Sequence, residues 1–200
     1  MWYIKLILAV FAYLAGSINF ARVIAGVKHI DITKKGSCNP GTMNVIRTIG
    51  KAAGVITFLL DCSKTILFAL LGMFYLSNVQ WAVILGFLVV FGHMYPVYYK
   101  FKGGKGVASV IGLYVCLAPV PTAVMVLLLV LYMKLFKYGF IGSLVLVTVL
   151  TAVIIAYNYS DPVIVSLISV LCLLIFFKHR GNIARLKKGE ENTLKKLDAK

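Results

Sequence analysis

The chain has 200 residues, of which 61% are hydrophobic, and its mean hydropathy is +0.95. Soluble globular chains are about 45–50% apolar, so this composition excludes an ordinary soluble domain and predicts one integral membrane domain over residues 1–200. Lys and Arg outnumber Asp and Glu by 21 to 6, but the basic residues stand between long apolar runs. We therefore interpret the charge as the cytoplasmic excess of a membrane protein and expect no nucleic-acid partner.

Seven apolar runs predict membrane-spanning helices, since about 20 apolar residues cross a hydrocarbon core of about 30 Å. In chain order the runs cover residues 2–24, 53–76, 81–98, 107–118, 120–136, 139–157 and 162–177. The first is interpreted as a retained span rather than a signal peptide, because no clear cleavage site follows it. Pro119 and Pro121 interrupt the stretch 107–133, which therefore forms either one long kinked helix or two short helices.

The distribution of basic residues selects seven spans. The loops 77–80 and 157–161 contain no Lys or Arg, and the basic residues gather in segments 22–51, 99–106, 134–137 and 178–200. Seven spans place all these basic segments on one side, whereas six would separate the tail from the first loop. We therefore expect an all-α polytopic membrane protein with its N-terminus outside and a basic cytoplasmic tail over 178–200. We expect the last residues, 190–200, to extend into solvent.

The four cysteines, at positions 38, 62, 116 and 172, show neither a disulfide framework nor metal-ligand spacing. Three of them lie inside apolar runs and are interpreted as small core residues. We expect no metal and no other cofactor.

The first basic loop carries small polar residues that suit an anion. It reads Gly36-Ser37-Cys38-Asn39-Pro40-Gly41-Thr42-Met43-Asn44, and Arg47 follows. Such residues let backbone N–H groups converge on a negative group. A helix starting here would place Asn44 and Arg47 on one face and its N-terminus toward that group. The alternative is an Asn-Pro-Gly turn that only reverses the chain.

Two later segments combine basic residues with glycine or amide side chains. The loop Lys102-Gly103-Gly104-Lys105-Gly106 surrounds an ammonium with glycines, so that a phosphate can approach the backbone. Alternatively it is a flexible turn at the membrane surface. The last apolar run ends in Lys178-His179-Arg180-Gly181-Asn182-Ile183, followed by Arg185. A basic flank that only anchors a helix needs no titrating group, which makes the histidine a candidate for function.

The three segments face the cytoplasm together under the seven-span topology. An electropositive site beside apolar spans suits a phosphorylated substrate from water and an acyl chain from the bilayer, so the pattern predicts phospholipid chemistry at the inner leaflet. Asp61 and Lys64 lie three residues apart within the second span. They are either a functional pair or an internal ion pair that neutralises both charges. We expect His93 to pack and to form a hydrogen bond.

Taken in order, these residues resemble the bacterial acyl-phosphate:glycerol-3-phosphate acyltransferases over nearly the whole chain. The first loop with Arg47 is similar to the family's first motif, 92–106 to its second, and 179–183 to its third; Gly16-Ser17-Ile18 and Asp61 with Lys64 also fit. The resemblance implies seven spans in the bacterial inner membrane, with the active site facing the cytoplasm. It also implies that a fatty acyl group moves from long-chain acyl phosphate to the 1-hydroxyl of glycerol 3-phosphate. The products would be lysophosphatidic acid and phosphate, in the first step of bacterial phospholipid synthesis. We expect a monomer embedded in membrane lipid.

The resemblance also implies functional residues. Positions needed for activity match Ser37, Arg47, His179 and Asn182, and glycines linked to glycerol-phosphate binding match Gly103, Gly104 and Gly106. Further substrate-binding candidates are Asn44, Lys64, Ser143 and Arg180.

The chemistry of the reaction suggests roles for several of these residues. Lys105 and Arg47 would hold phosphates. Ser37 and Asn39 would donate hydrogen bonds to the acyl-phosphate oxygens or to the developing oxyanion. His179 would be either the general base or a phosphate ligand.

The chain departs from the family pattern at several positions. Cys38 replaces a glycine, Thr42-Met43 replaces Ala-Thr, Gly181 replaces the glutamate of the third motif, and Phe140 replaces a serine three residues before Ser143. A diverged paralogue with another substrate or without activity is therefore one alternative. A second is a small transporter or channel for a phosphorylated or lipid anion. The polar residues gather at one face and no internal repeat is visible, which favours the enzyme.

Overall fold

Long apolar runs form helices in this chain, because a backbone in apolar surroundings must satisfy its own hydrogen bonds. The computed structural model describes residues 2–193, and this part of the chain contains ten α-helices. They are α1 (Trp2–Ser17), α2 (Phe20–Val27), α3 (Thr42–Thr48), α4 (Lys51–Leu70), α5 (Val79–Met94), α6 (Val107–Leu117), α7 (Pro119–Leu135), α8 (Gly139–Tyr157), α9 (Pro162–Lys178) and α10 (Arg180–Lys187). A π-helical turn, Leu71–Tyr75, extends α4, and a 3₁₀ turn, Val97–Tyr99, follows α5.

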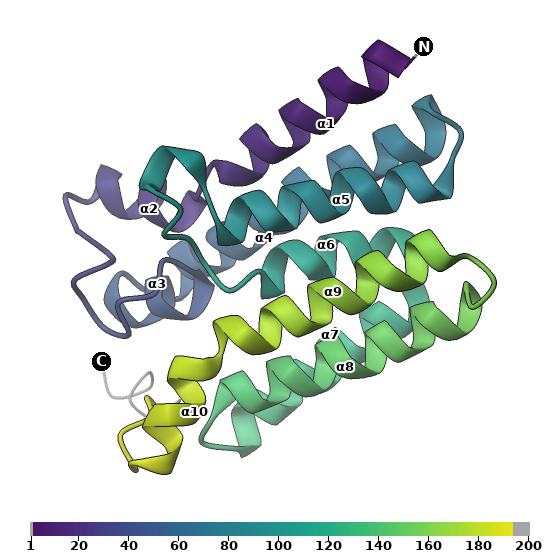
Figure 1. Ribbon diagram of the computed structural model, residues 1–200. Coiled ribbons are helices and arrows are strands. Elements are labelled where there is room, and N and C mark those ends of the chain that lie inside the picture. Colours follow the sequence, from purple (N-terminus) through teal and green to yellow (C-terminus); the bar gives the residue numbers. More distant parts are fainter. Residues whose placement is uncertain (1, 194–200) are drawn as a thin grey trace.

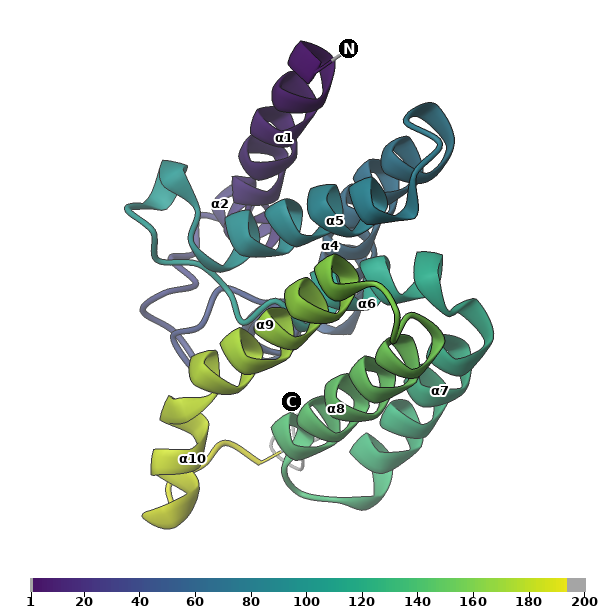
Figure 2. The ribbon, with the colours of Figure 1, turned by 45° about the vertical axis from the view of Figure 1, so that its right-hand side comes forward.

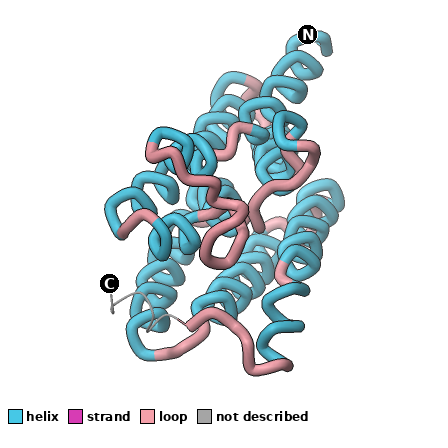
Figure 3. The backbone as a smooth tube through the Cα atoms, turned by 90° about the vertical axis from the view of Figure 1, so that its left-hand side faces the viewer, coloured by secondary structure: helices cyan, strands magenta, loops and turns pink. Residues whose placement is uncertain are grey.

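The long helices run side by side as a bundle. Helix α1 packs along α5, α4 contacts both α5 and α6, and α7 packs beside α8 (Figures 1 and 2). The short helices α2, α3 and α10 lie at the end of the bundle opposite to the N-terminus, whereas the turns α4–α5 and α8–α9 lie at the other end (Figure 1). Seen from the side of the short helices, several loops lie in the middle of the view between helices, and others lie at its lower edge (Figure 3).

Fewer than seven of the described helical segments have the length and composition of an ordinary membrane-crossing helix. Among residues 2–193, four continuous helical segments are sufficiently long and apolar, those built on α4, α5, α8 and α9. The pair α1 and α2, bent by 43°, makes a fifth if it is one broken span. Helices α6 and α7 are apolar but shorter. The 11 residues of α6 rise only about 16 Å at about 1.5 Å per residue. The structure thus shows an all-helical bundle with four or five candidate spans.

The predicted first span, 2–24, is divided into two helices. Helix α1 ends at Ser17, and Asn19 begins α2 by accepting a hydrogen bond from the Arg22 backbone N–H (2.9 Å). The break frees backbone carbonyls, and the Lys64 ammonium binds those of Gly16 (3.1 Å) and Ile18 (2.8 Å). A buried lysine on α4 therefore stabilises the bend that the apolar pattern alone does not predict.

The Pro-interrupted stretch forms two helices rather than one kinked helix. Helix α6 ends at Leu117, and Pro119 is the first residue of α7. Proline suits a first helical position because its missing N–H has no partner there in any case. This confirms that residues 107–133 belong to two helices, which was one of the two alternatives left open from the sequence.

Glu191 contradicts the expectation that residues 190–200 extend into solvent. Its side chain folds back against the bundle and is buried, 8% exposed. The hydrogen bonds of its carboxylate with Asn182 and Arg185 account for this, since a buried charge needs partners. The remainder of the predicted tail, residues 194–200, lies outside the described residues.

Candidate active site

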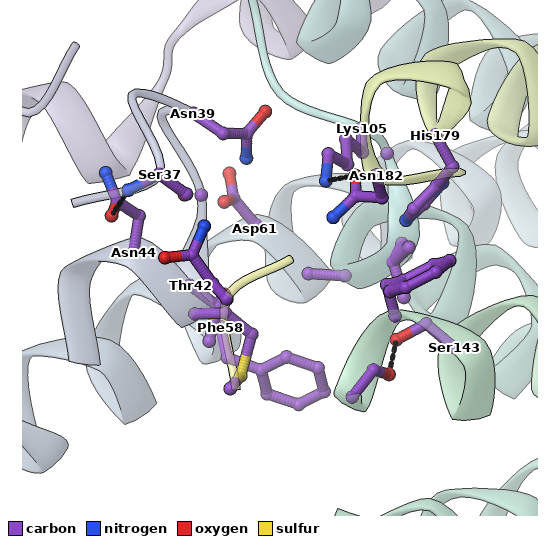
Figure 4. A pocket seen from close by; sticks show the side chains of 18 of the residues that line it. Ser37, Asn39, Thr42, Asn44, Phe58, Asp61, Lys105, Ser143, His179 and Asn182 are labelled. Carbon is purple, nitrogen blue, oxygen red and sulfur yellow. Dashed lines mark hydrogen bonds between the residues drawn. The ribbon is translucent and has the colours of Figure 1, made fainter. Parts of the chain in front are cut away.

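A cavity of about 160 Å³ opens inside the bundle near the end that carries α3 and α10. Its polar side chains come from the loop before α3, from the Gly-rich loop of residues 102–106 and from the α9–α10 junction (Figure 4), and helices α3, α4 and α8 contribute others. Its other walls are apolar and include Phe58, Ile111, Leu129, Met133 and Phe140. The cavity therefore has one side suited to charge and another suited to hydrocarbon.

A second hollow, of about 450 Å³, adjoins this cavity. The two share the lining residues Ser37, Asn39, Lys105 and Asn182. The cations that line the second hollow are Arg22, Lys102, Lys105, Lys178 and Arg185, and no acidic residue within 2–193 lines it. We call it the cationic hollow; its electrostatic character suits a phosphate.

Asn44 shapes the loop that carries Ser37. Its side-chain amide donates to the carbonyls of Ile32 (3.0 Å) and Lys35 (2.9 Å), and its Oδ1 accepts from the Ser37 N–H (2.8 Å). Gly36 has φ +60°, and a Cβ there would lie 2.2 Å from Asn44 Oδ1. Asn44 lines the cavity, but these three bonds engage its polar atoms, so it holds the loop in shape.

Helix α3 directs two further polar groups at the cavity. Thr42 and Arg47 both line it, and neither Thr42 Oγ1 nor Arg47 Nε has a hydrogen-bond partner within the described residues. Buried polar atoms are normally paired. Unpaired groups facing a cavity are therefore available to a bound molecule.

The glycines of the second loop allow it to pack against the end of α5. A Cβ at Gly103 would lie 2.2 Å from the His93 carbonyl oxygen, and a Cβ at Gly104 would lie 2.2 Å from His93 Nε2. The Gly104 N–H donates to the same carbonyl (3.1 Å), and Gly106 adopts φ +85°. These glycines are required by close packing, and the packing fixes the position of Lys105. Gly103 also lines the cationic hollow, and Gly106 lines the cavity.

Lys105 lies between the cavity and the cationic hollow. Its ammonium donates a hydrogen bond to Asn182 Oδ1. Burial lowers the pKa of Lys105 to about 8; Glu191 opposes this shift, while Arg185 and Arg47 reinforce it. A substrate phosphate would stabilise this buried ammonium electrostatically.

His179 presents one ring nitrogen to the protein and the other to the cavity. It is buried at the α9–α10 junction, and Nδ1 lies 2.8 Å from the Ile175 carbonyl oxygen. A carbonyl can only accept, so Nδ1 carries the hydrogen. In a neutral ring the Nε2 lone pair is then free. Since His179 lines the cavity, this lone pair can accept a hydrogen bond from a hydroxyl group.

Asn182 belongs to a network that the sequence only partly revealed. Its Nδ2 donates to Glu191 Oε1 (2.7 Å), and Arg185 Nε donates to Glu191 Oε2 (2.9 Å). Glu191 lines the cavity and is a site residue missed from the sequence. The charged residues around it led to the expectation that its side chain is exposed to solvent. Only the return of the chain after α10 brings that side chain into the cavity.

The remaining predicted residues fall into two groups. Ser143 lines the cavity, with its hydroxyl donating to the Gly139 carbonyl (3.2 Å). Lys64 and Arg180 line neither the cavity nor the cationic hollow. The Lys64 ammonium binds the backbone carbonyls at the α1–α2 break and forms an ion pair with Asp61 (2.8 Å). Arg180 is exposed and lies over the Phe177 ring. Asp61 itself does line the cavity; the sequence analysis considered it as half of a functional pair but named only Lys64 as substrate-binding.

Fold and site together define a class: an α-helical integral membrane protein in which a hollow lined by cations adjoins an apolar-walled cavity. Residues 6–189 match the family model described as glycerol-3-phosphate acyltransferase. The chain belongs to that family and is an acyltransferase.

Named relatives match over nearly their whole length. The glycerol-3-phosphate acyltransferase of Hydrogenobaculum sp. (strain Y04AAS1) is 37% identical over 193 residues, which are 96% of this chain and 98% of the relative. That of Aquifex aeolicus (strain VF5) is 37% identical over 190 residues, 94% of this chain and 97% of the relative.

Two crystal structures of PlsY (YgiH), an integral membrane glycerol 3-phosphate acyltransferase, share the fold. The glycerol 3-phosphate form superimposes with a TM-score of 0.87 at 34% identity and covers 94% of each chain. The lysophosphatidic acid form gives a TM-score of 0.85 at 33% identity, with 98% of this chain and 99% of that chain covered.

Proposed function

We propose that this chain transfers a fatty acyl group from acyl phosphate to the 1-hydroxyl of glycerol 3-phosphate, giving lysophosphatidic acid and phosphate. One observation supports this above all: a cationic hollow and an apolar-walled cavity meet at Ser37, Asn39, Lys105 and Asn182. An acyl phosphate has an anionic end and an apolar chain joined at the reacting carbonyl. That carbonyl would lie at the meeting point.

The phosphate groups are held by charge. Lys105 and Arg47 face the bound phosphates, and Arg185 and Lys102 raise the local concentration of anions in the cationic hollow. Ser37 and Asn39 donate hydrogen bonds to the acyl-phosphate oxygens or to the oxyanion that develops on the carbonyl. The hydrocarbon chain extends along the apolar wall past Phe58 toward the membrane.

The reaction requires no covalent enzyme intermediate. The glycerol hydroxyl oxygen attacks the acyl carbonyl carbon, and the carbon–oxygen bond to phosphate breaks with its electron pair leaving on the phosphate. The hydroxyl proton ends on that phosphate, which leaves as hydrogen phosphate. His179 Nε2 accepts the hydrogen bond of the attacking hydroxyl and so orients it.

The proposal includes a topology. Seven membrane passes, with the short helices α6 and α7 as two of them, place the basic segments of residues 22–51, 99–106 and 178–193 in the cytoplasm and the N-terminus outside. The membrane is the bacterial inner membrane, the whole chain is one acyltransferase domain, and the active protein is a monomer. Lys64 contributes by stabilising the α1–α2 break rather than by touching substrate.

One assay tests the donor and the acceptor together. Purified protein in detergent is given long-chain acyl phosphate with and without glycerol 3-phosphate, and phosphate and lysophosphatidic acid are measured. We expect stoichiometric release of both products only when both substrates are present. A protein that uses acyl-CoA instead would contradict the proposed donor. A transporter or channel for a phosphorylated or lipid anion would form neither product.

A further inference from the structure

Asp61 has a carboxylate oxygen without a partner at the wall of the cavity. The residue is 1% exposed, on α4, ten residues from the start of that helix. Its Oδ1 lies 2.8 Å from Lys64 Nζ and 3.3 Å from His93 Nδ1. Both oxygens are buried and neither makes a hydrogen bond within the described residues, but Oδ1 is in ion-pair contact with Lys64, whereas Oδ2 has no ion-pair contact there either. A buried carboxylate oxygen left without a partner is costly, so an occupant is expected there.

The position of this oxygen indicates that the occupant is a substrate. Asp61 lines the same cavity as Lys105 and His179. Figure 4 shows its carboxylate directed toward the loop that carries Ser37 and Asn39, across the view from Lys105 and Asn182. Lys64 and His93 hold Oδ1 from one side and thereby fix the orientation of the carboxylate. The group is preorganised rather than free to turn away.

A carboxylate oxygen accepts hydrogen bonds and repels anions, so Oδ2 does not bind a phosphate. It suits a hydroxyl group. The other buried amide and carboxylate oxygens at the cavity are engaged: Asn44 Oδ1 by Ser37, Asn182 Oδ1 by Lys105, and the Glu191 oxygens by Asn182 and Arg185. The free lone pair of His179 Nε2 is assigned to the hydroxyl that is acylated. Glycerol 3-phosphate has two hydroxyl groups, and only one is acylated. The second would be buried without a charged acceptor unless Asp61 supplied it.

We propose that Asp61 is a specificity residue, whose Oδ2 accepts a hydrogen bond from the acceptor hydroxyl that is not acylated. This inference rests on the proposed function, because it requires glycerol 3-phosphate to occupy the cavity. Asp61 would then distinguish a glycerol phosphate from phosphorylated alcohols with a single hydroxyl. A site that hydrogen-bonds a hydroxyl rejects analogues lacking it, because its own polar group is left unpaired.

The test compares glycerol 3-phosphate with 3-hydroxypropyl phosphate, which keeps the reacting primary hydroxyl and lacks the second one. With the wild-type protein, kcat/KM should be about ten- to a hundredfold lower for the analogue, the value of a hydrogen bond to a charged group. The variant Asp61→Leu with Lys64→Met replaces the ion pair by apolar side chains, and it should use the two acceptors with nearly equal kcat/KM. Equal use by the wild type, or an unchanged ratio in the double variant, would overturn the inference.

A second variant covers the case in which the double variant does not fold. In Asp61→Asn the amide oxygen is expected to stay on Lys64, so an N–H faces the cavity and only a weaker, neutral hydrogen bond remains. The ratio between acceptors should then fall below tenfold. Thr42→Val is the matched control, because Thr42 Oγ1 is a hydroxyl oxygen without a partner that also lines the cavity. It should preserve the wild-type ratio; a ratio that falls in Thr42→Val alone would assign the hydroxyl to Thr42.

Failure of the proposed function would be recognised separately. If acyl phosphate is not consumed with either acceptor, the donor assignment fails. Thermal stabilisation by each acceptor then still reports binding, since a ligand that binds the folded state raises Tm. Glycerol 3-phosphate should raise Tm more than 3-hydroxypropyl phosphate at equal concentration in the wild type. Equal shifts would contradict the role of Asp61.

Discussion

Lys105 is a buried charged residue, and burial of its charge is unfavourable unless a substrate phosphate pairs with it. Its ammonium is removed from water, no carboxylate within residues 2–193 contacts it directly, and its hydrogen bond goes to the neutral Asn182 oxygen. The natural partner is a substrate phosphate. We expect Lys105→Ala to reduce kcat/KM for glycerol 3-phosphate by about ten- to a hundredfold, which corresponds to about 1.5–3 kcal/mol. Lys34→Ala, which removes an 83% exposed lysine paired with Asp31, is the matched control. Unchanged kinetics in a folded Lys105→Ala variant would make the second loop a simple surface turn.

The same residue predicts a pH dependence. Burial lowers the pKa of Lys105 from 10.5 to about 8, so the free enzyme loses this positive charge as the pH rises through 8. We expect kcat/KM for glycerol 3-phosphate to be level near pH 7 and to decline above about pH 8, since kcat/KM reports the ionisation of the free enzyme. Lys105→Arg keeps its charge at these pH values, so its profile should lack the decline. A decline at the same pH in the arginine variant would assign it to another group.

Two substitutions test the role of His179, because each keeps a hydrogen bond at only one of its two ring nitrogens, Nε2 or Nδ1. A glutamine oxygen reaches the position of Nε2, whereas an asparagine amide reaches only that of Nδ1 and its bond to Ile175. If His179 orients the attacking hydroxyl, His179→Gln should keep kcat within about tenfold, and His179→Asn should lose about ten- to a hundredfold. A general base would behave differently. Both variants would then lose about 10²–10⁴-fold in kcat, because neither can take a proton.

At the level of elements, the Gly-rich loop of residues 102–106 depends on its contact with the end of helix α5. A methyl group at Gly104 would lie 2.2 Å from His93 Nε2, whereas one at Gly181 on α10 would meet its nearest neighbour, Arg185 Nη1, at an ordinary 3.5 Å. Gly104→Ala should therefore displace Lys105 and lower kcat/KM in a protein that still folds. Gly181→Ala, in the first turn of α10, should change stability by no more than about 0.5 kcal/mol, measured by thermal unfolding, because its methyl group meets only an ordinary contact. Equal behaviour of the two variants would contradict the packing described for the loop.

The apolar pattern predicts individual helices well. Helix α8 covers the predicted residues 139–157, and α9 extends the predicted 162–177 by one residue. These elements are long, apolar and limited by polar or proline residues, so local sequence decides them. The first span failed as a single helix because its bend depends on Lys64, which lies more than 40 residues away in the sequence. The element boundary there is a tertiary effect, and hydropathy does not contain it.

At the level of the whole molecule, the resemblance and the charge pattern located the site to three segments, and the structure brings those segments together. Hydrogen bonds join them across the chain: Arg22 to Lys102, and Lys105 to Asn182. What the sequence could not provide was the direction of each side chain. Arg180 was predicted at the site and points away, while Glu191 was expected in solvent and lines the cavity. Both outcomes depend on the helical phase of α10 and on the turn after it.

The proposed topology can be tested on the intact molecule. In a background with Cys38, the one exposed cysteine of the described residues, changed to serine, single cysteines replace exposed residues at both ends of the bundle. Lys34, Lys100 and Glu190 belong to the basic end, and Tyr159, in the α8–α9 turn, belongs to the other. Because basic segments remain in the cytoplasm, a membrane-impermeant maleimide should label only position 159 in intact cells.

All four positions should react after the membrane is permeabilised, which shows that each thiol is accessible. Labelling of position 190 from outside would place the end of α10 on the outer face and overturn the seven-pass arrangement, because α6 and α7 would then contribute one pass rather than two.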